Sequence, residues 1–166
     1  EYIVYPFVEI FDLIDSETAE KISCTVKGCK DFADVLVSQG VRLEMDASIW
    51  EEEIALDIRK VRQVIRNLLS NAFKYRKNEI IVEVALDKKT FDISITDDGK
   101  GIEKEFQDRV FEKYFQLGDE RGHCVRGHGL GLAGALVLVE DMGGKMTLES
   151  EMNQGARFSV SLPAGR

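Results

Sequence analysis

Three groups of residues in this sequence have types and spacings that suit a phosphate-bearing ligand. The first is the glycine-rich run GHGLGL at residues 127–132, which leads without a break into the apolar run 133–142. Glycines let the backbone approach an anion closely, and the free N–H groups of a first helical turn supply donors at the positive end of the helix dipole. A plain glycine turn is the competing interpretation for this group.

The second group lies on a predicted helix from Arg59 to Tyr75. Along it, Asn67, Asn71 and Lys74 are spaced i, i+4 and i+7, so they share one stripe beside the apolar face. A neutral amide oxygen suits Mg²⁺ that keeps its waters, and a lysine one turn on can pair with phosphates. A solvated polar face is the alternative here.

The third group, DDGKGI at residues 97–102, follows a predicted strand at 91–96. A carboxylate at a strand end can project into a crevice and accept from an exocyclic amine. Adenine offers a donor where guanine offers an oxygen, so Asp97 would select ATP over GTP. An ordinary Asp-Gly turn is the alternative.

These groups need a scaffold, and the periodicity of the chain predicts one. The strands are paired by hairpins, and the helices have one apolar side that must be buried. This combination indicates a two-layer α+β sandwich. The remaining expected elements are strands at 9–15, 41–46, 49–56, 80–86, 145–149 and 157–162, a helix from Ser16 or Thr18 to Gly40, short helical pieces at 103–115, a polar loop at 116–126 and a helix at 133–142.

Composition limits the classes of function. The 166 residues, with two prolines and no internal linker, predict a single domain spanning 1–166. A net charge of −8 argues against a nucleic-acid surface and a basic membrane patch. Three cysteines without zinc-ligand spacing favour a reducing, cytoplasmic setting. The chain does not begin with methionine, so we expect it to be a piece of a longer protein.

Taken together, the motifs resemble the ATP-binding catalytic domain of sensor histidine kinases, in the superfamily shared with gyrase, heat-shock chaperone and mismatch-repair ATPases. The likeness is collinear and covers essentially the whole chain. The matching segments are the N box at 66–75, the first glycine box at 97–102, the F box at 110–115, the second glycine box at 127–132 and a last short glycine motif at 155–158.

The resemblance implies a Bergerat ATP-binding fold, with a mixed, mostly antiparallel sheet of about five strands packed against three helices, and an ATP lid at 116–126. It also implies ATP and Mg²⁺ as cofactors. Asn71, with Asn67 nearby, would ligate the metal, and both would act in catalysis with Lys74. The implied nucleotide-binding residues are Asn71, Lys74, Tyr75, Asp97, Gly99, Gly101, Ile102, Phe115, Gly127, His128, Gly129, Leu130, Gly131 and Leu132.

Two positions depart from the family pattern. Asp98 stands where a neutral polar residue is frequent, and we expect its charge to weaken nucleotide binding. Gln116 stands after the F box where a basic residue is frequent, which puts one of the family's phosphate contacts in doubt. The only histidines are His123 and His128, in the lid and glycine box. We therefore expect the phospho-acceptor histidine to lie on a separate helical dimerisation domain.

The function predicted from this resemblance is that of a protein-histidine kinase in two-component signal transduction. The domain would bind Mg·ATP and donate the γ-phosphoryl group to the acceptor domain of the same protein, without labelling itself, and a response regulator would act downstream. No contact with nucleic acid or membrane is expected of this domain, whether or not its parent is membrane-anchored. The alternatives are an ATPase of the superfamily, an anti-sigma-like serine kinase, and a catalytically silent nucleotide-binding module.

An ATPase of this superfamily needs a carboxylate base one helical turn before the metal-ligating asparagine. That position here is Asn67, whose amide cannot accept a proton. The sequence thus argues against hydrolysis.

Overall fold

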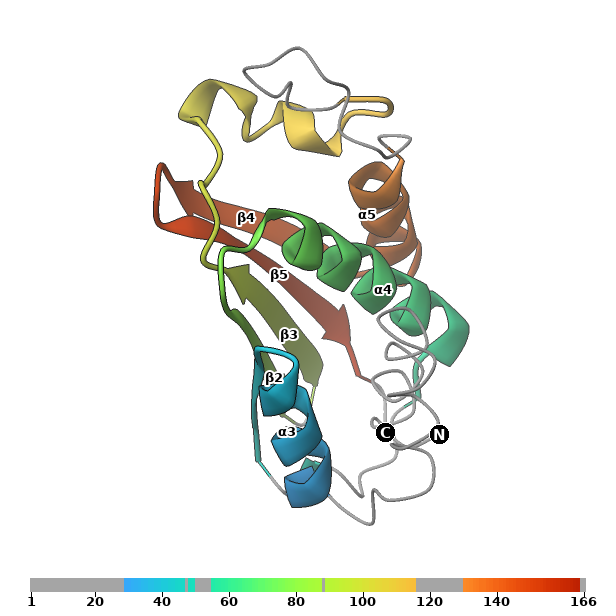
Figure 1. Ribbon diagram of the computed structural model, residues 1–166. Helices are drawn as coiled ribbons and strands as arrows, with labels where there is room; N and C mark the ends of the chain where they lie inside the picture. The colour runs from blue at the N-terminus through green and yellow to red at the C-terminus, as the bar shows by residue number, and fades with distance from the viewer. Residues whose placement is uncertain (1–28, 47, 50–54, 88, 116–129, 165–166) are drawn as a thin grey trace.

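The computed structural model describes residues 29–46, 48–49, 55–87, 89–115 and 130–164. Within them, three helices lie on one side of a single sheet (Figure 1). The helices are α3 (Cys29–Ser38), α4 (Ile58–Tyr75) and α5 (Gly131–Asp141), and two short 3₁₀ turns, η3 (Lys104–Phe106) and η4 (Arg109–Phe111), follow the third strand. The predicted two-layer α+β sandwich is confirmed.

The sheet has five strands in the order β1-β2-β3-β5-β4. β1 is parallel to β2, and every other neighbouring pair is antiparallel, so the sheet is mixed and mostly antiparallel, as expected. β3 lies at the centre of the sheet, and its last residue pairs with Ile80 on one side and Ala156 on the other. The strands are β1 (Val41–Met45), β2 (Ile80–Leu86), β3 (Thr90–Asp97), β4 (Lys145–Glu151) and β5 (Gly155–Pro163).

The hydrophobic core fills the space between α4, α5 and one face of the sheet. Alternate residues of β3 face it, and Phe91, Ile93 and Ile95 are all at most 2% exposed. α4 contributes an apolar stripe at helical spacing, which explains why this segment forms a helix over the sheet. The stripe consists of Val61, Val64, Ile65, Leu68, Leu69 and Ala72.

Local hydrogen bonds set several element boundaries. The Asp57 carboxylate accepts from the backbone N–H groups of Arg59 and Lys60, at 3.1 and 3.3 Å, and so caps the start of α4. Gly143, with φ of +74°, follows the last turn of α5 and donates to the carbonyl of Glu140. It acts as a glycine cap at the C-terminal end of the helix.

One expected strand begins differently. The Asp46 carboxylate accepts from Ser48 N and Ser48 Oγ, and Ile49 N donates to the Asp46 carbonyl, so residues 48–49 form a helical turn rather than the start of a strand. Residues 50–54 lie outside the described part of the chain, as do the expected strand at 9–15 and the helix before Cys29. None of the described helices has the length and apolar character needed to cross a membrane.

Candidate nucleotide site

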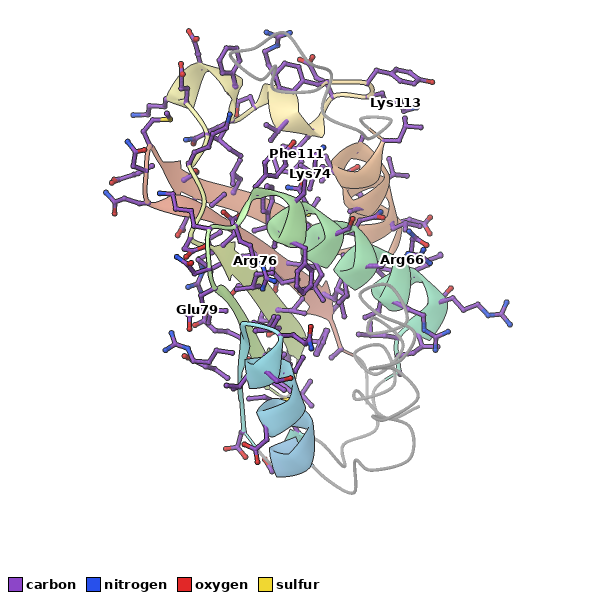
Figure 2. The ribbon with its side chains drawn as sticks, in the orientation of Figure 1. Arg66, Lys74, Arg76, Glu79, Phe111 and Lys113 are labelled. Atoms are coloured by element: carbon purple, nitrogen blue, oxygen red, sulfur yellow. The ribbon has the colours of Figure 1, made fainter. Side chains whose placement is uncertain are left out.

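The site is built where the C-terminal half of α4 lies beside the end of β3. The polar stripe predicted on α4 borders the buried face: Asn67 and Asn71 are half-buried, and Lys74 is exposed. Figure 2 shows Lys74 near the C-terminal end of the helix, with Arg66 toward the other end. The Lys74 ammonium lies 5.0 Å from the centroid of the Tyr75 ring, within range of a cation–π contact.

The two asparagines differ in their surroundings. Asn67 Oδ1 accepts from Gln63 Nε2 at 2.9 Å, one turn earlier on the helix. On its other side, a Cβ added to Gly134 would lie 3.9 Å from Asn67 Nδ2, so α5 approaches α4 closely here. The amide oxygen of Asn67 is thus already engaged within α4. Asn71 is one turn closer to the end of β3, and its oxygen is the kind of hard ligand that fits Mg²⁺.

Asp97 ends the central strand β3 and is only 4% exposed. Its Oδ1 accepts from the backbone N–H of Gly99 at 2.8 Å. Burial raises the pKa of this carboxyl, against the lowering effect of the Gly99 and Ala156 N–H groups, and the neighbouring Asp98 charge raises it further. A buried acceptor at the end of a strand is what recognition of a ligand amine requires.

Three glycines let backbone segments meet around Asp97. A Cβ on Gly99 would lie 2.3 Å from the Tyr75 carbonyl oxygen, so this loop lies directly against the end of α4. Gly101 has φ of +75°, and a Cβ there would lie 2.0 Å from the Glu151 carbonyl oxygen. Gly155, at φ of +87°, would clash in the same way with the carbonyl oxygen of Asp97.

The first glycine box is also hydrogen-bonded to the β4–β5 hairpin. Ile102 is 8% exposed, and its N–H donates to Ser150 Oγ at 2.9 Å. Ser150 Oγ in turn donates to the Gly155 carbonyl at 2.6 Å. The Gln107 amide nitrogen donates to the carbonyls of Ile102 and Ser150, both at 2.9 Å. The bonds from Ile102 to Ser150 and from Gln107 to Ser150 join residues far apart in sequence, and sequence patterns gave no sign of them.

Removing the freedom of Gly155 should destabilise the protein. We expect Gly155→Ala to lower the melting temperature clearly, because a Cβ would lie 1.8 Å from Asp97 O, and a left-handed backbone costs about 1–2 kcal/mol for an ordinary residue. Gly131→Ala is the matched control, since a Cβ there meets nothing within 4 Å. Thermal unfolding of both variants by circular dichroism is the measurement, and equal melting temperatures would refute the close packing.

The F box and the residues just before it form a small aromatic cluster. The Phe106 and Phe115 rings lie 6.0 Å apart, and the Arg109 guanidinium lies 4.6 Å from the Phe115 centroid. Phe111 meets Phe158 of β5 edge to face at 6.3 Å, which attaches the segment to the sheet (Figure 2). Tyr114, in contrast, is 74% exposed and has φ of +66°.

The second glycine box is described only from Leu130 onward. Leu130 is the N-cap of α5 but makes no side-chain cap hydrogen bond, and the first turn carries no acidic residue. Among the described residues, no side chain caps the N–H groups of that turn, and such groups are suited to binding an anion. Gly131 and Leu132 belong to the first turn. Residues 127–129 and the expected lid at 116–126 lie outside the described residues.

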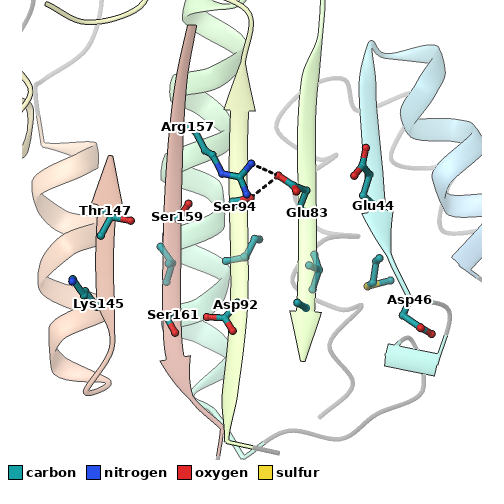
Figure 3. A pocket seen from close by; sticks show the side chains of 15 residues that line it. Glu44, Asp46, Glu83, Asp92, Ser94, Lys145, Thr147, Arg157, Ser159 and Ser161 are labelled. Atoms are coloured by element: carbon teal, nitrogen blue, oxygen red, sulfur yellow. Dashed lines mark hydrogen bonds and ion pairs between the residues drawn. The ribbon is translucent and has the colours of Figure 1, made fainter. Parts of the chain in front are cut away.

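A groove of about 470 Å³ lies on the opposite, open face of the sheet (Figure 3). Among its lining residues, Arg157 Nη1 and Glu83 Oε2 form an ion pair at 2.8 Å, and Ser94 Oγ donates to the same glutamate oxygen at 2.9 Å. Arg157 is thus already paired with a carboxylate. None of the residues expected to bind the nucleotide lines this groove, and we place the candidate site on the helix side.

The sequence and the fold are similar to those of known proteins. A family profile described as "Histidine kinase-, DNA gyrase B-, and HSP90-like ATPase" matches residues 56–166, from the start of α4 to the end of the chain. The chain belongs to this family. Its sequence relatives place it, within the family, with the ATP-binding catalytic domains of sensor histidine kinases.

Two curated relatives illustrate this. The adaptive-response sensory kinase SasA of Gloeothece citriformis is 34% identical over 140 residues, covering 82% of this chain and 35% of that protein. The sensor protein RprX of Bacteroides fragilis is 38% identical over 116 residues, covering 66% of this chain and 22% of RprX. This histidine-kinase domain therefore spans about a third or less of the length of these relatives.

Solved structures support the fold. A mycobacterial sensor histidine kinase, MprB, superposes with a TM-score of 0.61 at 20% identity, over 96% of both chains. The catalytic domain of the histidine kinase ThkA superposes with the same score at 22% identity, over 82% of this chain and 89% of that one. The full-length ShkA structure, which also scores 0.61 at 20% identity over 96% of this chain and 36% of ShkA, is a complex with AMPPNP.

Proposed function

We propose that this domain binds Mg·ATP and presents the γ-phosphoryl group to a histidine on a separate helical domain of its parent protein. The observation that carries the proposal is the pairing of a buried carboxylate, Asp97, with the end of α4, against which Gly99 packs without room for a Cβ. This contact brings the expected adenine acceptor beside the helix that carries Asn71 and Lys74.

In this proposal each group has one task. Asp97 accepts the hydrogen bond of the adenine amine, and Gly99 and Gly101 shape the floor on which the base lies. Lys74 and the N–H groups at the start of α5 compensate phosphate charge. Asn71 would hold Mg²⁺, which would supply charge neutralisation on the phosphate oxygens. The catalytic contribution of the domain is thus positioning and electrostatic stabilisation.

The transfer itself needs no nucleophile from this chain. The lone pair of a neutral imidazole nitrogen on the acceptor forms the N–P bond while the bond between the γ-phosphorus and the β,γ-bridging oxygen breaks, and ADP leaves. The second ring nitrogen then loses its proton to solvent. The product is a phosphoramidate, and phosphate is passed on from there to a response regulator.

We expect the isolated domain to hydrolyse ATP hardly at all and to carry no label itself. Asn67, whose oxygen accepts from Gln63, occupies the place where a water-activating base would stand, and an amide cannot take a proton. With the acceptor domain of its own parent and radiolabelled ATP, the label should appear on that domain and should be acid-labile and base-stable.

The same assay separates the alternatives. Brisk phosphate release by the isolated domain would favour a superfamily ATPase, and acid-stable label on a partner would favour a serine kinase. Nucleotide binding without any transfer would favour a silent module. Each of these three results would contradict the proposed function.

A further inference from the structure

The sequence led us to expect that the charge of Asp98 weakens nucleotide binding, but the structure shows its carboxylate bound to a backbone turn. Its Oδ1 accepts from the backbone N–H groups of Lys77 and Asn78, at 2.8 and 3.0 Å, and its Oδ2 also lies 3.0 Å from Asn78 N. Both donors belong to the turn of residues 76–79 that joins α4 to β2. The carboxylate therefore faces this turn.

The charge of Asp98 is compensated by backbone dipoles. Burial acts to raise the pKa of this carboxyl, but the N–H groups of Asn78, Lys77 and Glu79 outweigh it, so the net shift is downward. A carboxylate held by successive backbone N–H groups is a stable ionic arrangement. Asp98 is therefore ionised at neutral pH, with its charge directed at the turn.

The turn is also held from its other side. Arg76, the residue after α4, donates from Nη1 to the carbonyl oxygens of Gln39 and Gly40, at 2.8 and 3.3 Å. Its guanidinium lies 4.5 Å from the centroid of the Phe73 ring, and Figure 2 shows it beside the turn. Arg76 thus fixes the turn to the segment before β1, while Asp98 fixes it to the end of β3.

The two attachments of this turn affect the position of Asp97 relative to α4. Asp97 and Asp98 are consecutive, so one faces the interior beside α4 and the other holds the turn that follows α4. Gly99, next in line, packs against the carbonyl of Tyr75, the last residue of α4. The distance between the adenine acceptor and the helix that carries Lys74 therefore depends on this connection.

We propose that Asp98 is a positioning residue, which sets the nucleotide site by clamping the turn after α4 to the end of β3 through the N–H groups of Lys77 and Asn78. The proposal rests on the proposed function, because the effect of Asp98 is measured as a change in nucleotide affinity. It replaces the expectation that Asp98 repels the phosphates.

Two substitutions distinguish positioning of the turn by Asp98 from repulsion of phosphate by its charge. Asp98→Ala removes every acceptor, and we expect the affinity for Mg·ADP to fall about tenfold, the loss typical of hydrogen bonds to a charged group. Asp98→Asn keeps one oxygen that can accept from the turn, and its affinity should stay within about threefold of the original chain. Asp108→Ala is the control, because Asp108 is exposed and its side chain makes no cap hydrogen bond to the η4 turn that it precedes.

Calorimetric titration of Mg·ADP into these variants decides between the two roles. A gain in affinity in both Asp98 variants would show that the charge repels phosphate, and unchanged affinity in Asp98→Ala would show that the turn does not set the site. Either result overturns the proposal.

Amide exchange measured by NMR without nucleotide tests the clamp independently of binding. The Lys77 and Asn78 amides should be protected in the original chain, exposed in Asp98→Ala and protected again in Asp98→Asn. Rapid exchange of both amides in the original chain would refute the clamp. Failure of the original chain to bind nucleotide would instead refute the proposed function while leaving this exchange result readable.

Discussion

Asp97→Asn should lower the affinity for Mg·ATP by about tenfold or more. An asparagine can turn a donor toward the adenine amine, and this mispairing is costly because position 97 is only 4% exposed. A buried polar group left mispaired costs roughly 1–3 kcal/mol, and 1.4 kcal/mol is a factor of ten. Isothermal titration calorimetry of both proteins in the presence of Mg²⁺ is the measurement.

Asp92→Asn is the matched control for this substitution. Asp92 lies on the same strand but on the open face of the sheet, where its carboxylate accepts from Thr90 Oγ1 at 2.9 Å. The change removes an equal charge at a distance from the site, so nucleotide affinity should not alter. Equal affinities of the Asp97 variant and the original chain would rule out Asp97 as the adenine acceptor.

Asn71→Ala should abolish phosphoryl transfer to the acceptor domain, with a loss of about 100-fold or more, the effect of removing one electrostatic stabiliser of a transition state. We expect the original chain to bind ADP more weakly when EDTA removes Mg²⁺. Asn71→Ala should abolish this dependence of ADP affinity on Mg²⁺. Lys74→Ala should weaken transfer less, by about tenfold, because the N–H groups of α5 still compensate the phosphates.

Ser70→Ala serves as the control for these two changes. Ser70 is the exposed neighbour of Asn71 on α4, and alanine favours the helix. Transfer rates with radiolabelled ATP, and ADP titrations with and without EDTA, measure the effects. If Asn71→Ala kept a Mg²⁺-dependent ADP affinity, the metal would have to be held elsewhere.

Much of the fold could be predicted because its patterns are local. The apolar periodicity of α4 and the alternation along β3 each depend on which face is buried, and that is visible in sequence. The expected helix at 59–75 is observed as Ile58–Tyr75, and the expected strand at 91–96 as Thr90–Asp97. The short 3₁₀ turns η3 and η4 likewise agree with the helical pieces expected before Phe115.

The parts that sequence could not give depend on contacts between distant residues. The Asp98 carboxylate is about twenty positions from its donors Lys77 and Asn78, and no spacing rule links them. The Ser48–Ile49 turn stands where an expected strand was to begin, because the Asp46 side chain holds the local backbone. The hydrogen bond from Gln63 to Asn67 could have been predicted, because residues at i and i+4 are neighbours on a helix. It was not predicted from the sequence.

Titration of ATP and GTP into the same Mg²⁺-containing sample of the unmodified chain tests adenine recognition by Asp97 most directly. The buried Asp97 carboxylate can accept from the amine of adenine but meets an oxygen on guanine. Calorimetry should therefore show ATP binding more than about tenfold tighter than GTP. Equal affinities for the two nucleotides would contradict the assignment of Asp97 and, with it, the placement of the site beside α4.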